Sequence, residues 1–192
     1  MNTILAFIFV FLMMPLGHAY MIVAERMGER AEVLACIASI VTGMLLLIWT
    51  RFQKTEKAQT ITGAIAGIML WTGFAEYSMV FGARILAVKE LGGTSGTYRM
   101  MEHTWGFALA LFIFLFFHEG VRCEFILYLR RKLKIVKGPP VSGKVTNYGP
   151  RVAFELFSVT WIFYILLLLA YDERIFGVRS WFTYLLFILS LG

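Results

Sequence analysis

The chain has 192 residues, of which 59% are hydrophobic and 16% are charged, and its mean hydropathy is +0.75. Soluble domains carry about 25% charged residues, so this composition excludes an ordinary soluble domain and indicates an integral membrane protein. The formal net charge is +6. Because the basic residues lie mainly between the apolar segments, the charge indicates membrane orientation and not binding to nucleic acid.

A helix needs about 20 residues to cross a bilayer, and six apolar segments are candidate spans. In chain order they are residues 3–23, 33–50, 61–88, 104–128, 152–171 and a shorter 180–191. No Lys or Arg precedes the first segment, so we expect an uncleaved span there. The long apolar runs do not alternate with polar residues, which disfavours strands. The sequence therefore predicts an all-α fold, with residues 1–192 forming one polytopic transmembrane helical bundle of about six helices.

The distribution of Lys and Arg predicts how the chain is oriented. Residues 51–60 and 129–151 contain ten of these residues, whereas the alternate connections 24–32, 89–103 and 172–179 contain six. Basic residues are enriched in cytoplasmic connections. We therefore expect both termini in the cytoplasm, in a multi-pass protein of the cell membrane of the bacterial inner-membrane type.

Residues 129–151 are the one long connection and are predicted to be a basic cytoplasmic loop. The Pro, Gly and Ser residues in its second half are typical of an irregular segment. Its basic residues are expected either to fix the topology alone or to contact anionic lipid or an acidic partner. The residues proposed for that contact are Arg130, Arg131, Lys132, Lys134 and Lys137.

Four ionisable residues are predicted to gather towards the outer face of the membrane. His18 and Glu76 each lie 15 residues after the start of their spans, which places both about 22 Å from the inner boundary. Glu102 and His103 lie at the outer mouth of the fourth span, and Glu25 could approach from the loop after the first span.

This set of side chains is compatible with several kinds of site. His18, Glu76, Glu102 and His103 could together hold a transition metal such as Fe, Mn, Zn or Cu, or relay a proton. His18 and His103 could instead ligate a b-type haem. The structural alternative is a hydrogen bond between His18 and Glu76, with Glu102 and His103 hydrated at a helix start.

The remaining polar residues of the spans are predicted to be structural. Glu119, Arg122 and Glu155 are expected to form ion pairs that join the fourth and fifth predicted spans. Arg84 is expected to extend to the outer interface. Gly63 and Gly67 form a GxxxG pattern, which predicts that the third span packs closely at the centre of the bundle.

No P-loop, Rossmann fingerprint, nucleophile elbow or HExxH motif occurs in the sequence, and three functions stay open. The favoured prediction is a non-catalytic or accessory subunit of a larger membrane complex, because the connections are short and no catalytic motif is complete. Its partners would be the lipid bilayer and other membrane subunits or further copies of the chain. The alternatives are a membrane-embedded oxidoreductase that uses a metal or haem at the outer leaflet, and a small proton or cation transporter or channel subunit that uses Glu76.

Overall fold

The structure is a computed structural model, which describes residues 16–89, 96–118, 120–121, 123–134, 147–177 and 179–185. All regular secondary structure within these residues is helical, which confirms the predicted all-α class for this part of the chain. The elements in chain order are residues 16–26, α2 (Glu29–Thr50), α3 (Glu56–Leu70), η1 (Trp71–Glu76), α4 (Tyr77–Ile85), α5 (Gly96–Glu102), α6 (Trp105–Phe117), α7 (Glu124–Lys132), α8 (Gly149–Tyr171) and residues 181–185.

Three helices within the described residues are long and apolar enough to cross a membrane, namely Glu29–Thr50, Glu56–Ile85 and Gly149–Ala170. They correspond to the second, third and fifth predicted spans. The second of these helices runs without interruption through α3, η1 and α4. It begins at a defined cap, because the side chain of Thr55 accepts a hydrogen bond from the backbone N–H of Ala58 and Glu56 follows in the first turn.

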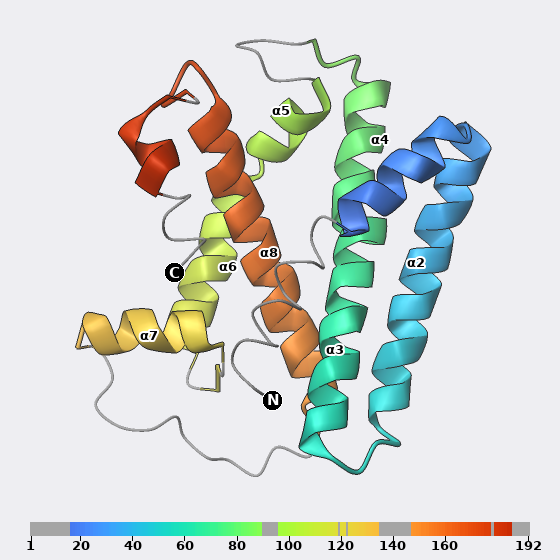
Figure 1. The fold of residues 1–192 in the computed structure, drawn as a ribbon, viewed down its shortest axis with the longest axis vertical. Helices are drawn as coiled ribbons and strands as arrows, with labels where there is room; N and C mark the ends of the chain where they lie inside the picture. Colours follow the sequence, from blue (N-terminus) through green and yellow to red (C-terminus); the bar gives the residue numbers. More distant parts are fainter. Residues whose placement is uncertain are drawn as a thin grey trace.

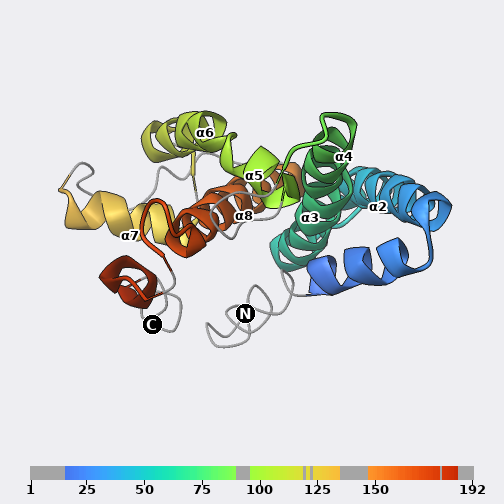
Figure 2. The ribbon, with the colours of Figure 1, turned by 90° about the horizontal axis from the view of Figure 1, so that it is seen from above.

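The long helices form a row. Figures 1 and 2 show α3 beside α2, α8 beside α3, and α6 beside α8, and the inter-helix contacts follow the same order. The helix of residues 16–26, drawn in blue, crosses one face of α2 and of the α3–α4 run (Figures 1 and 2). The α3–α4 run therefore lies inside the row, between α2 and α8, and the N-terminal helix packs against it.

Close packing of α3 against α8 depends on two glycines. A Cβ atom on Gly67 would lie 2.7 Å from the carbonyl oxygen of Ala153, and one on Gly63 would come still closer to the backbone of Gly149. Backbones can approach this closely only where no side chain intervenes. The structure thus confirms that the GxxxG pattern marks a helix contact at the centre of the row.

The fourth predicted span, residues 104–128, is wrong as a single helix. The chain instead forms α6, leaves helical geometry at His118, where ψ is 116°, and resumes as α7 after Cys123. The side chain of Arg130 donates to the carbonyl oxygens of Phe116 at 2.5 Å and His118 at 2.9 Å. These two carbonyl oxygens at the end of α6 therefore have hydrogen-bond donors, although the helix does not continue.

The helix α7 runs across the direction of α6 and α8 (Figure 1). Arg131, Lys132 and Lys134 are exposed there, as a contact with lipid or a partner requires. Arg130 differs from that expectation, since it is only 5% exposed and its guanidinium serves the end of α6. Lys137, the fifth residue proposed for this contact, lies outside the described residues.

Other predictions also fall outside the described part of the chain, in whole or in part. They are residues 3–15 of the first predicted span, residues 186–191 of the sixth, and the side chains of Glu119 and Arg122. What the structure does describe of the first span is helical from residue 16 to residue 26. The sixth predicted span is represented by the helical residues 181–185.

Candidate functional site

His18 and Glu76 meet between the N-terminal helix and η1, as their matched depth predicts. Nδ1 of His18 lies 2.9 Å from Oε1 of Glu76, which is a hydrogen-bond distance. The Glu76 side chain is 5% exposed, whereas that of His18 is 40% exposed. The partly exposed imidazole of His18 therefore lies between the surface and the buried carboxyl group of Glu76.

Glu76 ends a stretch of π-helix. The six residues of η1, from Trp71 to Glu76, have the wider turn that often occurs at functional positions inside α-helices. Three buried polar atoms of this stretch have no hydrogen-bond partner: Nε1 of Trp71, Oγ1 of Thr72 and Oε2 of Glu76. Such atoms are uncommon in folded proteins and call for an explanation. Of these three residues, Glu76 is the one that also lines a cavity.

The cavity beside Glu76 has a volume of about 250 Å³. The N-terminal helix, α2, the η1–α4 run, α5 and α8 all contribute side chains to it. The lining residues that can form hydrogen bonds or carry charge are His18, Glu25, Glu32, Glu76, Tyr98 and Tyr164. Several polar groups thus converge on one hollow, as they do in binding sites.

Two of the cavity's carboxylates are held by Arg84. Its Nη1 donates to Oε2 of Glu32 at 2.6 Å, and its Nη2 donates to Oε1 of Glu25 at 3.1 Å. The expectation that Arg84 extends to the interface is therefore incomplete, because its guanidinium is bonded to two carboxylates. The Glu32 side chain is only 3% exposed, and a carboxylate buried to that degree requires a cationic partner.

The four residues proposed as metal ligands do not come together. Nδ1 of His103 lies 2.7 Å from the carbonyl oxygen of Arg99 on an exposed surface. Glu102 is 6% exposed and accepts a bond from Arg174 at 3.2 Å. Among the described residues, no group of three or more His, Cys, Asp and Glu side chains could hold a metal ion. The depth estimate thus placed Glu102 and His103 at the correct end of the molecule but not in the cavity.

Glu102 belongs to a second cluster, in the segment that follows α8. Asp172 is fully buried and is bonded through its carboxylate to the guanidinium of Arg174. Burial and the neighbouring Asp172 carboxyl group raise the pKa of Glu102. The hydrogen bonds from Arg174 lower the pKa of Asp172. The fold therefore favours the protonated form of Glu102 and the ionised form of Asp172.

The predicted inner ion-pair cluster is described only in part. Nε of Arg151 lies 3.3 Å from Oε1 of Glu155, one turn apart on α8. Gly120 is next to this pair, and a Cβ atom there would collide with the Arg151 guanidinium. The proposed partners Glu119 and Arg122 lie outside the described residues. The position of Glu155 at an ion pair is consistent with a structural function for this end of the molecule.

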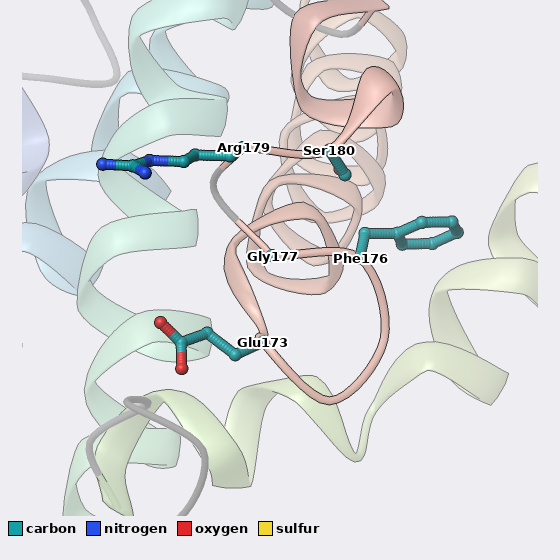
Figure 3. Close-up of a pocket in the computed structure, with 5 residues that line it drawn as sticks. All are labelled: Glu173, Phe176, Gly177, Arg179 and Ser180. Atoms are coloured by element: carbon teal, nitrogen blue, oxygen red, sulfur yellow. The ribbon is translucent and has the colours of Figure 1, made fainter.

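A larger hollow, of about 600 Å³, lies beside the segment after α8. It is lined by Glu173, Phe176, Gly177, Arg179 and Ser180. Figure 3 shows that these side chains diverge, with Phe176 directed away from Glu173 and Arg179. Because a binding site needs polar groups that converge, the smaller cavity at Glu76 is the stronger candidate.

Three of the polar residues that line this cavity are not indicated by the sequence pattern. Glu32 was treated as part of a polar loop, although it lies in the first turn of α2. Tyr98 and Tyr164 carry no motif, and an apolar span gives no indication of which tyrosine faces a cavity. One feature of the sequence does indicate a bond to Glu32. Residues 24–32 contain several carboxylates, and Arg84 lies at a corresponding depth in the third predicted span.

No known protein family, characterised protein or solved structure matches this chain. The functional assignment therefore depends on the residues described above.

Proposed function

We propose that this chain is a multi-pass protein of the cell membrane, with six spans and both termini in the cytoplasm, that binds and releases a proton or cation at Glu76. It would act as a small transporter or channel subunit. The observation that carries the proposal is the buried Glu76, which lines the cavity and whose Oε2 atom has no hydrogen-bond partner. Ionisable groups within membrane spans are costly and typically belong to ion or proton pathways.

The arrangement of the helix ends supports the proposed topology. The turn from α2 to α3 and the start of α8 lie at one end of the molecule, where the side chain of Gln59 accepts a bond from the backbone N–H of Tyr148. The ends of α4 and α8 and all of α5 lie at the other end (Figure 1). Residues 51–60, which contain three basic residues, and the start of α8 thus lie at the first end, which is the cytoplasmic one by the positive-inside rule.

The cavity belongs to the opposite, outer end. Glu25 and His18 are its more exposed members, and Glu32 and Glu76 are its buried members. A cation or proton that entered from this side would meet carboxylates before it reached Glu76. Clefts of one charge sign concentrate ions of the other sign, so this gradient of burial suits uptake from the outer face.

A flux measurement tests the proposal. The purified full chain is reconstituted in liposomes that contain a pH-sensitive dye, and a potassium gradient with valinomycin sets the membrane potential. We expect proton or cation-coupled pH changes with the wild type, loss of most of that flux in Glu76→Gln, and retention in the exposed control Glu29→Gln. Equal flux in wild type and Glu76→Gln, or none above empty liposomes, would contradict the proposal.

A non-catalytic subunit of a larger complex is the second candidate, and α6 favours it. This helix has 13 residues, so it is about 20 Å long, shorter than the membrane's hydrocarbon core of about 30 Å. Its large side chains at Trp105, Phe107 and Phe117 are more than half exposed. A short apolar helix of this kind is stabilised by association with other helices. Crosslinking in native membranes, followed by mass determination, distinguishes a complex from a lone chain.

A further inference from the structure

The cavity at Glu76 has an unequal balance of charge. Three carboxylates line it, at Glu25, Glu32 and Glu76. Arg84 bonds to the first two, so its single positive charge is shared by two negative ones. Glu76 has His18 at one of its two oxygens. The interior therefore favours an occupant that carries positive charge.

The carboxyl group of Glu76, which lines the cavity, also lacks one hydrogen-bond donor. Oε1 of Glu76 is within bonding distance of His18, whereas Oε2 is buried and has no partner. The residue is 4% exposed, so bulk water has little access to that oxygen. A buried acceptor without a partner costs about 1–3 kcal/mol. An occupant with an N–H group at this point would remove that cost.

The walls of the cavity are largely apolar. Beside the polar groups it is lined by the side chains of Met21, Ile22, Val80 and Met101. Its volume of about 250 Å³ is several times the volume of about 30 Å³ that one water occupies in the liquid. A bare inorganic ion would leave most of this space without contacts. Methionine side chains adapt to organic groups of varied shape.

We propose that the occupant is a small organic amine in its ammonium form, with the ammonium group bonded to the carboxylate of Glu76 and the alkyl part against Met21 and Met101. This inference deepens the proposed function, because it specifies the cation that Glu76 exchanges. It depends on four properties of one cavity: excess negative charge, a buried acceptor without a donor, apolar walls and sufficient volume.

Binding of this kind is an exchange of positive charges. When Glu76 is protonated, the ammonium ion displaces that proton: the O–H bond of the carboxyl group breaks, the proton leaves to solvent, and an N–H group of the amine bonds to the resulting carboxylate. No covalent bond to the amine forms, and no oxidant or reductant is involved. Acid should therefore weaken amine binding, and amine should release a proton.

Calorimetric titration of the full chain in detergent tests the inference with n-butylammonium as the probe. The neutral 1-butanol and the inorganic Na⁺ serve as comparison ligands. We expect saturable binding of n-butylammonium, proton release on binding, and affinity at least tenfold lower in Glu76→Gln. The variant Glu29→Gln should bind as the wild type does. Equal binding of 1-butanol, or binding of Na⁺ at the site without n-butylammonium, would overturn the inference.

A second variant separates loss of the site from loss of the fold. Val80→Phe narrows the cavity without changing its charge, so it should weaken n-butylammonium binding several-fold, while the thermal midpoint in detergent shows whether the fold is retained. Affinity for n-butylammonium that is unchanged in Val80→Phe would overturn the placement of the alkyl group. If flux depends on Glu76 but no amine binds, the organic cation is wrong and the proposed function stands. If neither is observed, both are wrong.

Discussion

Arg84 donates to the buried carboxylate of Glu32 at 2.6 Å and thereby joins the end of α4 to the start of α2. The two residues are 52 positions apart, so this contact fixes how the outer ends of two helices sit relative to one another. It also determines the charge of the cavity, because Glu32 lines it together with Glu76. A single guanidinium therefore contributes to both the fold and the candidate site.

Removal of that guanidinium should destabilise the protein. In Arg84→Ala the Glu32 carboxylate, 3% exposed, loses its cation. Removing one member of a buried ion pair typically costs about 3–5 kcal/mol. Because Arg84 is 40% exposed and reached by water, we expect the free energy of unfolding to fall by the smaller amount of about 1–3 kcal/mol. Thermal unfolding in detergent measures the change. Arg30→Ala, an exposed change in the first turn of α2, is the control, and an equal midpoint in both variants would contradict the ion pair.

Gly67→Ala should separate α3 from α8. The added methyl group would lie 2.7 Å from the carbonyl oxygen of Ala153, and a backbone atom cannot move aside by changing rotamer. Overpacking of this kind costs about 1–3 kcal/mol, more than the gain of about 1 kcal/mol from replacing glycine inside a helix. We expect a lower thermal midpoint in detergent.

The matched control for this substitution is Gly106→Ala in α6. No atom lies within 4 Å of a Cβ atom at Gly106, so only the helix propensity changes and the midpoint should stay the same or rise. If Gly67→Ala were as stable as Gly106→Ala, the close contact between α3 and α8 would be absent in the folded protein.

The sequence predicted the long helices well, because an apolar run of span length permits few other structures in a membrane. It failed at residues 104–128, because the predicted span includes the polar stretch 118–124, where the helix breaks. That break depends on the guanidinium of Arg130 reaching the carbonyl oxygens of Phe116 and His118. Hydropathy measures only the apolar content of a segment and cannot detect this contact.

The candidate site was predictable to the extent that it depends on depth. His18 and Glu76 lie on neighbouring helices at similar depth, and helical rise alone predicts that they meet. The direction of a side chain around its helix is a different quantity. Glu102 faces Arg174, which is 72 residues away in an irregular segment, and no pattern in the sequence indicates that bond. Depth alone therefore grouped Glu102 and His103 with a site to which they do not belong.

Thr104→Val should destabilise the contact between the α5–α6 turn and α8. The indole N–H of Trp161 donates to the hydroxyl of Thr104 at 2.9 Å, and Trp161 is only 6% exposed. Valine has nearly the same shape but no acceptor, and a buried donor left without a partner costs about 1–3 kcal/mol. Thermal unfolding measures the loss. Thr104→Ser keeps the hydroxyl and should be less destabilised, and a serine variant as unstable as the valine one would exclude the hydrogen bond as the cause.

The cluster after α8 predicts how stability depends on pH. The pKa of Glu102 is raised from its ordinary 4.5 by burial and by Asp172. The folded protein thus holds this proton more tightly than the unfolded chain does, and the resulting stability is present below about pH 4.5 and lost as the pH rises through the folded value. The pKa of Asp172 is lowered from 3.8 by Arg174, so its contribution is present above about pH 3.8 and lost in acid.

Glu102→Gln should therefore flatten the pH dependence of stability above pH 4.5. Glutamine keeps the shape of the protonated acid at every pH, so the thermal midpoint in detergent should fall less than that of the wild type between about pH 5 and about pH 8. Glu173→Gln, at an exposed neighbouring position, should follow the wild-type curve. Asp172→Asn should be destabilised most near neutral pH, because Arg174 then lacks its buried carboxylate. Parallel curves for wild type and Glu102→Gln would show that Glu102 holds no extra proton in the folded protein.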